Sequence, residues 1–461
     1  MTHVVIIGGG PGGYEAALVA AQLGAEATIV DRDGIGGSTV LTDCVPSKTL
    51  IATSELMAEV EGAAELGVQL GQTAEDDGPV TVDLARVNDR VKALAQAQSA
   101  DIARRLERES VRVLRGTARL EGADKVVATL DDGGTESLSA DVVLLATGAH
   151  PRVLPSAEPD GERILTWEQV YDLDALPERL IVVGSGVTGA EFAGAYMTLG
   201  TDVALVSSRD RVLPGEDADA AAVLEEVFTR HGMEVLSRSR MQQVERTADG
   251  VLVTLTDGRT VEGSHCLLAL GSVPNSSELG LESAGVEVDD AGFISVDKVS
   301  RTSARGVYAA GDCTGVLMLA SVAAMQGRIA MSHALGDAVF PLDLWEVVSN
   351  VFTSPEIATV GFTQADVDSG AVTARSVMLP LSGNPRAKMQ GVRDGFVKLF
   401  SRPGTGTVIG GVVVGPHASE LIHAVSVAVD CRLTVDQLAQ SFTVYPSITG
   451  SIAEAARRLH R

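Results

Sequence analysis

The chain has 461 residues, with 36 Lys and Arg against 61 Asp and Glu, and its formal net charge is −25. An acidic excess of this size repels phosphate backbones and anionic lipids, so we expect no nucleic-acid partner and no membrane partner. Hydrophobic residues make up 45% of the chain but aromatic residues only 3%. This predicts a core of Ala, Val, Leu and Ile, as in α/β proteins with buried parallel strands.

Length and targeting signals narrow the class of protein further. At roughly 150 residues per domain, the length suggests about three domains. Four cysteines are too few for a disulfide scaffold, and no apolar run reaches the roughly 18 residues of a membrane span. The opening MTHVVIIGGG has no basic segment before its first strand, so we expect no signal peptide. These features predict a cytoplasmic α/β protein.

The first motif is a dinucleotide fingerprint within residues 3–31. A short apolar strand, a glycine turn, an Ala-rich helix and a second strand follow in that order, and the second strand ends on an acid. Gly8, Gly10 and Gly13 satisfy the G-x-G-x-x-G pattern, which lets a pyrophosphate approach the free N–H groups of the helix. Asp31 is the acid that can accept hydrogen bonds from ribose hydroxyls.

The same pattern returns over residues 180–206, where Gly184, Gly186 and Gly189 take the three glycine positions. Two fingerprints in one chain predict two bound dinucleotides, which is far more informative than one fingerprint alone.

The acid position of the second fingerprint has changed. Ser207 stands there, and Arg209 and Arg211 follow it closely. Without a carboxylate to hold a 2′-hydroxyl, and with arginines nearby, the site favours NADPH, although NADH remains possible.

The remaining segments complete an α/β pattern. Residues 83–115 read as one long or two shorter charged helices, and Asp312 ends a turn and short strand before a helix that begins near Leu319. From about residue 345 an α+β segment carries no glycine fingerprint. Further strands are predicted at 111–114, 125–130, 141–146, 395–400 and 408–414, and helices at 420–429 and 434–440.

Together these motifs make the chain resemble the pyridine nucleotide–disulfide oxidoreductases over nearly its whole length. The segments that carry the resemblance are GGGPGGYEA at 8–16, CVPSK at 44–48, ATG at 146–148, GSGVTGAE at 184–191, TSARGVYAAGD at 302–312 and VFTSPEIATVGFT at 351–363.

The resemblance implies a fold and a domain plan. The fold class is α/β, with two Rossmann-like dinucleotide-binding domains and a C-terminal α+β dimerisation domain that makes a homodimer. FAD is expected in residues 1–150 and 271–344, NAD(P)H in 151–270, and the interface domain in 345–461.

The resemblance also implies site residues. Lys48 is expected near flavin N5, paired with Glu191, and Cys44 and Tyr445 complete the catalytic candidates. The expected FAD contacts are Gly8, Gly10, Gly13, Asp31, Gly37, Ser38, Lys48, Ala118, Thr147, Gly148, Gly271, Asp312 and Ala320. The expected NAD(P)H contacts are Gly184, Gly186, Gly189, Ser207 and Arg209.

Two departures from the family pattern concern the half-reaction in which electrons pass from the flavin through a disulfide to the substrate. Cys44 aligns with the flavin-proximal cysteine of the redox pair, but its partner position holds Thr39, which cannot form a disulfide. The family's His-Pro base is replaced by Tyr445, whose ordinary pKa of about 10 makes it a poor base at neutral pH. The following Glu is replaced by Gly450. These changes argue against lipoamide dehydrogenase and glutathione reductase activity.

We therefore predict an FAD-dependent NAD(P)H:quinone reductase, because a quinone takes two electrons without needing a thiol or a base. Two alternatives stay open: a soluble pyridine nucleotide transhydrogenase, and a catalytically silent flavoprotein in a larger complex. No His, Cys and Asp cluster has metal-ligand spacing, so no metal is expected.

Overall fold

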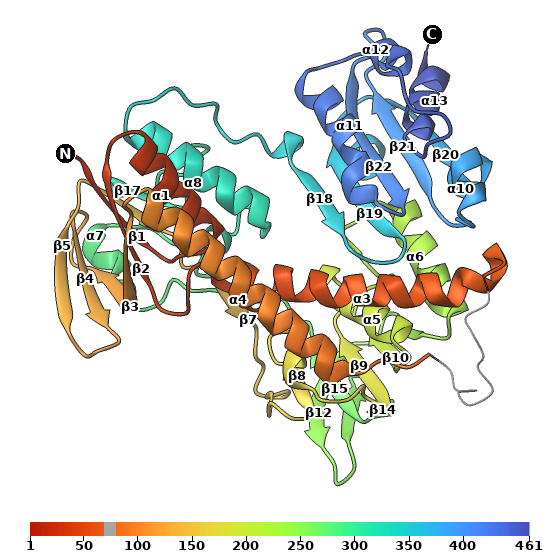
Figure 1. Cartoon of the computed structure of the whole chain (residues 1–461), viewed down its shortest axis with the longest axis horizontal. Coiled ribbons are helices and arrows are strands. Elements are labelled where there is room, and N and C mark those ends of the chain that lie inside the picture. The colour runs from red at the N-terminus through yellow and green to blue at the C-terminus, as the bar shows by residue number, and fades with distance from the viewer. Residues whose placement is uncertain (69–79, 461) are drawn as a thin grey trace. The chain divides into compact units, whose positions relative to one another are not determined.

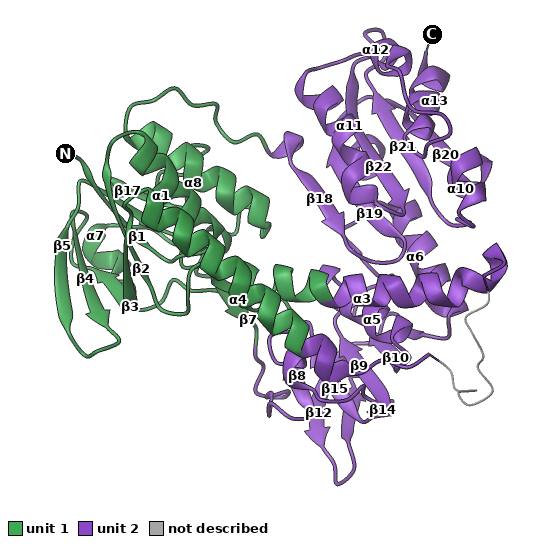
Figure 2. Cartoon of the chain, in the orientation of Figure 1, with its two compact units in different colours: residues 1–49, 89–152, 271–343 green, residues 50–88, 153–270, 344–461 purple. Residues whose placement is uncertain are grey.

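The computed structural model describes residues 1–68 and 80–460. The chain divides into two compact units (Figure 2). The first unit comprises residues 1–49, 89–152 and 271–343, and the second unit comprises residues 50–88, 153–270 and 344–461.

A seven-stranded sheet forms the centre of the first unit, in the order β17-β6-β1-β2-β3-β4-β5. Strands β17, β6, β1 and β2 run parallel to their neighbours, and β3 continues into an antiparallel edge with β4 and β5. The bounds are β1 His3–Ile7, β2 Glu26–Asp31, β3 Arg112–Leu120, β4 Lys125–Leu130, β5 Thr135–Ser139, β6 Val142–Leu145 and β17 Val307–Ala309.

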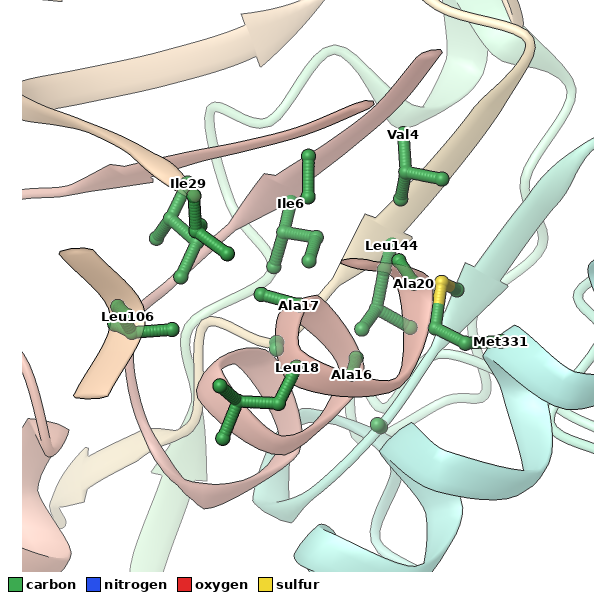
Figure 3. Close-up of a cluster of buried hydrophobic side chains, with 14 of the residues drawn as sticks. Val4, Ile6, Ala16, Ala17, Leu18, Ala20, Ile29, Leu106, Leu144 and Met331 are labelled. Carbon is green, nitrogen blue, oxygen red and sulfur yellow. The ribbon is translucent and has the colours of Figure 1, made fainter. Parts of the chain in front are cut away.

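Helices α1 (Pro11–Gln22) and α8 (Ala320–Ala334) lie side by side against this sheet (Figure 1). A Cβ added at Gly327 would stand 2.1 Å from the Gly12 carbonyl oxygen, so the two glycines allow the close approach. Figure 3 shows the aliphatic core between α1 and the strands, with Ile6 and Ile29 fully buried. The core contains small aliphatic side chains, as the low aromatic content predicts.

The remaining helices and short strands of the first unit lie between the elements already described. The charged segment for which one long or two shorter helices were predicted over 83–115 forms one helix, α4 (Leu84–Arg108), and the segment's last residues belong to β3. The shorter elements are α2 Gly37–Leu41, β7 Ala149–Pro151, β16 Ser272–Pro274, α7 Leu281–Ala284 and η3 Asp312–Thr314, while α3 (Cys44–Gly62) runs from the residues of the first unit into those of the second.

The second unit contains a five-stranded parallel sheet in the order β11-β10-β9-β15-β8. An antiparallel meander, β12-β13-β14, lies between β11 and β15 in the sequence and was not predicted. The bounds are β8 Ile164–Thr166, β9 Arg179–Val183, α5 Val187–Thr198, β10 Asp202–Val206, α6 Ala218–Arg230, β11 Glu234–Leu236, β12 Met241–Arg246, β13 Val251–Leu255, β14 Thr260–Gly263 and β15 His265–Leu268.

An antiparallel sheet in the order β18-β19-β22-β21-β20 forms the C-terminal part of the second unit. Helix α11 packs on β22 and β19, and α13 packs on β20 and β21. The bounds are β18 Val348–Val351, β19 Glu356–Gly361, α9 Gln364–Asp368, β20 Arg375–Pro380, α10 Pro385–Met389, β21 Phe396–Ser401, β22 Val408–Gly415, α11 Ala418–Asp430, α12 Val435–Gln440 and α13 Gly450–Leu459; the 3-10 turns are η1 Ala63–Leu66, η2 Val170–Asp172, η4 Leu344–Glu346 and η5 Leu381–Gly383. Two Rossmann-like sheets and an α+β domain confirm the predicted fold class.

A buried ion pair ties the C-terminal sheet to α6. The Nζ of Lys398 donates to Asp217 Oδ2 (2.8 Å) and Asp219 Oδ2 (2.6 Å), and the Lys398 side chain is only 4% exposed. Asp217 also caps α6 by accepting from the backbone N–H groups of Asp219 and Ala220. Lys398 therefore neutralises a carboxylate that has no access to water.

Lys398→Met is expected to lower the free energy of unfolding by about 3–5 kcal/mol, because it leaves the Asp217 carboxylate buried and unpaired. Urea unfolding followed by circular dichroism measures the change. Arg246→Met is the matched control, since Arg246 pairs with Asp160 on the surface, and it should cost no more than about 1 kcal/mol. Equal losses in the two variants would contradict the assignment.

Candidate functional site

The glycine turn of the first unit leaves open space where a phosphate would be expected. Gly10 is the N-cap of α1, and a Cβ built on it would be 4.0 Å from its nearest neighbour, the Gly37 Cα. At Gly13, by contrast, a Cβ would collide with the Gly8 carbonyl oxygen at 1.9 Å. Gly13 is therefore needed for packing, whereas Gly10 leaves room beside the N–H groups at the start of the helix.

Asp31 holds this turn in place. Its Oδ2 accepts from the Gly9 N–H (2.7 Å) and its Oδ1 from the Gly34 N–H (2.5 Å). Burial raises the pKa of the Asp31 carboxyl. Each oxygen keeps a second lone pair, so the carboxylate can shape the loop and still accept a ribose hydroxyl.

A cavity of about 180 Å³ opens beside Asp31. Gly8, Ala118 and Thr147 from the predicted set line it, together with Asn275. The volume is below the roughly 300–1,000 Å³ of typical ligand pockets, so it fits one end of a dinucleotide. Since the donors and the open space suit a nucleotide, these residues fit the FAD that the resemblance implies.

Asn275 was not predicted from the sequence. Its Nδ2 donates to the Thr147 carbonyl oxygen (2.9 Å), its N–H donates to the Gly148 carbonyl oxygen (3.0 Å), and Thr147 Oγ1 donates to its carbonyl oxygen (2.6 Å). Asn275 therefore fixes the Ala-Thr-Gly turn at the end of β6. Gly271, also predicted, accepts from the Arg152 N–H (2.9 Å) at the start of the β7 and β16 pair.

Asp312 begins η3, and burial together with the charge of Asp43 raises its pKa from the ordinary 3.8 to about 6. The preceding Gly311 N–H donates to Gln326 Oε1 (2.8 Å) on α8, the helix that begins at Ala320. This bond positions the strand end from which the Asp312 carboxylate can accept hydrogen bonds from polyol hydroxyls.

This raised pKa predicts a pH dependence for the flavin-free protein. The folded protein binds the Asp312 proton more tightly than the unfolded chain does, so the stabilisation is complete below about pH 4 and is lost as the pH rises through about 6. Relative to Asp312→Asn, the wild-type protein should lose up to about 3 kcal/mol of unfolding free energy between those pH values. Urea unfolding of both proteins at several pH values measures this difference, and a constant difference would contradict it.

The predicted redox segment also lies in the first unit. Gly37 and Ser38 open α2, and Cys44 opens α3, which also carries Lys48. The Ser38 carbonyl oxygen accepts from the Asp43 N–H (2.8 Å), which closes the turn between the two helices. None of the four cysteines, all of them among the described residues, is in a disulfide.

The second glycine turn offers a matching cradle. Gly186 is the N-cap of α5, with a φ of −72° and nothing within 4 Å of a built Cβ. Gly184 and Gly189 are tightly packed, since a Cβ at Gly189 would lie 1.8 Å from the Gly184 carbonyl oxygen. The space beside Gly186 and the N-terminus of α5 therefore fit a second dinucleotide.

Glu191 is buried on α5, and its Oε1 accepts from the Phe352 N–H (2.8 Å) just after β18. This bond joins the nucleotide-binding sheet to the C-terminal sheet at a predicted catalytic residue. Tyr445 lies elsewhere in the C-terminal part, and its side chain is 84% exposed.

At the end of β10, Ser207 is fully buried and its Oγ lies 2.6 Å from Ser185 Oγ. Arg209 is exposed, and its N–H donates to Ser207 Oγ (3.2 Å). Arg211 turns toward α6, where it lines an open groove and donates to the Pro214 carbonyl oxygen (3.3 Å). The structure therefore separates the two arginines that the sequence had grouped.

The described residues contain neither a candidate membrane span nor a candidate metal cluster. In residues 1–68 and 80–460, no helix is both long and apolar enough to cross a membrane. The same residues contain no cluster of three or more His, Cys, Asp or Glu side chains that could hold a metal ion.

Comparison with known proteins gives the same pattern along the chain. Residues 2–327 match the model of the pyridine nucleotide-disulphide oxidoreductases, and residues 347–456 match the dimerisation domain of that family. A Mycobacterium tuberculosis protein called NAD(P)H dehydrogenase (quinone) is 57% identical, over 100% of this chain and 94% of that protein. A dihydrolipoyl dehydrogenase from Haloferax volcanii is 33% identical, over 99% of this chain and 95% of that protein.

Solved structures agree with these matches. The crystal structure of LpdA from Mycobacterium tuberculosis has a TM-score of 0.95 at 57% identity, with 100% of both chains covered. The HOCl-induced flavoprotein disulfide reductase RclA from Escherichia coli, as its Cu(II) complex, has a TM-score of 0.88 at 22% identity, with 100% of this chain and 99% of that chain covered. The RclA likeness shows the fold alone.

Proposed function

The chain belongs to the pyridine nucleotide-disulphide oxidoreductase family, and from this premise we propose that it is a flavin-dependent NAD(P)H:quinone oxidoreductase. The relative that is 57% identical carries the name NAD(P)H dehydrogenase (quinone). FAD, when bound, accepts a hydride from NAD(P)H and passes two electrons to the acceptor.

The observation that carries the proposal is the missing second thiol. Thr39 occupies the position of a partner for Cys44, and the other thiols are poor substitutes. Cys313 is fully buried, its thiol donates to the Ala310 carbonyl oxygen (3.3 Å), and burial raises its pKa to about 11. Cys266 is also fully buried, with its pKa raised by burial, and Cys431 is exposed at the C-terminal end of α11. A diffusible two-electron acceptor suits a flavin site that has no disulfide.

The chain's own residues would bind and orient the two dinucleotides and tune the reactivity of the flavin. The N–H groups at the start of α1 and α5 would hold the two pyrophosphates, and Asp312 would accept from the flavin's polyol chain. Lys48 would face the flavin ring, and Glu191, buried and held by the Phe352 N–H, would fix the nicotinamide end. Tyr445 would form part of the acceptor's wall without acting as a base at neutral pH.

We propose NADPH as the preferred electron donor, with NADH as a possible second donor. Ser207 is buried against Ser185, so it shapes the loop and offers no carboxylate to a 2′-hydroxyl. Arg209 stands exposed at the same strand end, where a 2′-phosphate is expected.

A homodimer is the proposed assembly. The C-terminal domain matches the family's dimerisation domain, and its Phe442, Val444 and Tyr445 side chains are largely exposed. A second copy would remove this apolar segment from water. Four cysteines are too few for a disulfide scaffold, and none of them, all among the described residues, is in a disulfide, so we propose the cytoplasm.

Anaerobic titration of the purified yellow protein tests the function. We expect NADPH to bleach the flavin with about two electrons per FAD, and a benzoquinone, but not lipoamide or glutathione disulfide, to reoxidise it rapidly. Uptake of about four electrons would reveal a hidden disulfide and overturn the proposal. Transfer from NADPH to thio-NAD that outpaces quinone reduction would favour the transhydrogenase instead.

A further inference from the structure

Two loops leave the second Rossmann-like sheet at the same edge. Strands β10 and β11 are parallel neighbours, with Val206 paired to Leu236 at their ends. Beyond that pair, the Ser239 N–H donates to the Ser207 carbonyl oxygen (2.7 Å) and the Arg238 N–H donates to the Arg209 carbonyl oxygen (2.6 Å). These bonds hold the two loops together and place Arg209 and Arg238 next to each other.

Both arginines are exposed, and neither forms an ion pair with any of the residues that the structure describes. Some arginines of this domain are paired, such as Arg179 with Asp202 and Arg246 with Asp160. In a chain of net charge −25, two arginines on hydrogen-bonded loops, neither of them ion-paired among the described residues, supply local positive charge that is suited to an anion.

The backbone at Arg238 adds a second argument. Its φ of 55° lies in the left-handed region, which favours glycine and costs an arginine roughly 1–2 kcal/mol. Strained conformations of this kind cluster at functional sites. A long cationic side chain is therefore kept at a position where chain geometry alone would favour glycine.

We propose that Arg238 joins Arg209 to bind the 2′-phosphate of NADPH, and that Arg238 determines the choice between NADPH and NADH. The inference rests on the proposed function, because it takes the nucleotide to bind at the Gly184–Gly189 turn beside β10. Two guanidinium groups can share the oxygens of one phosphate monoester through charge-assisted hydrogen bonds. Asp210, the acid between Arg209 and Arg211, is the side chain that would favour NADH.

The test compares Arg238→Ala and Arg209→Ala with the wild-type protein, using NADPH and NADH separately against one benzoquinone. We expect each variant to lower kcat/KM for NADPH by about tenfold or more, the usual size of a lost hydrogen bond to a charged group, and to change the value for NADH less than about twofold. Arg246→Ala, which removes the same charge elsewhere in the domain, should leave the NADPH to NADH ratio unchanged.

Calorimetry supplies a readout that does not depend on turnover. The wild-type protein should bind 2′,5′-ADP more tightly than 5′-AMP, and Arg238→Ala should reduce that difference by about tenfold. An unchanged NADPH preference in Arg238→Ala, or an equal loss with both donors, would overturn the role of Arg238 while the reductase itself stands. If neither donor reduces the flavin but 2′,5′-ADP still binds through Arg238, the proposed function fails and the anion site survives.

Discussion

Gly186→Val is expected to slow flavin reduction by NAD(P)H more than about 100-fold while the protein folds normally and keeps its FAD. The φ of −72° at Gly186 is accessible to any residue, and no atom lies within 4 Å of a built Cβ, so the chain itself tolerates the change. The space that valine fills is the space through which a pyrophosphate reaches the N–H groups of α5. Without room for the pyrophosphate, its hydrogen bonds to the α5 N–H groups are lost. The binding energy that aligns the nicotinamide with the flavin is lost with them.

Stopped-flow mixing with NADPH measures this loss, and dithionite serves as a reductant that needs no binding site. The matched variant is Gly10→Val, because Gly10 is the N-cap of α1 with the same open surroundings. Gly10→Val should release FAD, whereas Gly186→Val should retain it. Normal reduction of Gly186→Val by NADPH would show that the second fingerprint does not bind the donor.

Most of the two Rossmann-like sheets could be predicted because their strands are buried on both faces and their turns need glycine. The second fingerprint was predicted over residues 180–206, and β10, its second strand, ends at Val206. The β12-β13-β14 meander was missed because β12 is mostly exposed and carries polar and charged residues, such as Gln243, Glu245 and Arg246. Strands β18 to β20 were missed because Pro355 interrupts the segment, β18 has only four residues, and β20 alternates intermediate and exposed residues.

The glycines of the candidate site could be located from spacing alone, but their partners could not. Asn275 donates a hydrogen bond to the Thr147 carbonyl oxygen, 128 residues away in the sequence. No local sequence pattern predicts such a long-range bond. The backbone hydrogen bond from Arg238 to Arg209 is what places Arg238 beside the second glycine turn's neighbouring loop, and no sequence pattern predicts that bond. Burial of a side chain could not be predicted either: Ser207 occupies the acid position of the second fingerprint, but its side chain is fully buried.

Thr39→Cys is expected to convert the two-electron flavoprotein into one that takes up about four electrons per FAD, because a disulfide stores two more. Thr39 lies in α2 and Cys44 opens α3, and the Thr42 and Asp43 N–H groups both donate to the Ser38 carbonyl oxygen, at 2.9 and 2.8 Å, which closes the turn between the helices. Anaerobic dithionite titration counts the electrons.

The double variant Thr39→Cys/Cys44→Ser is the control, since it restores a single thiol and should return the uptake to about two electrons. Lipoamide reduction by Thr39→Cys should stay slow, because Tyr445 still replaces the family's histidine base. Four-electron uptake with slow lipoamide turnover would show that the thiol and the base were separate losses. Unchanged two-electron uptake would mean that the turn between α2 and α3 no longer brings position 39 within the Cα separation of about 4.4–6.8 Å that a disulfide needs.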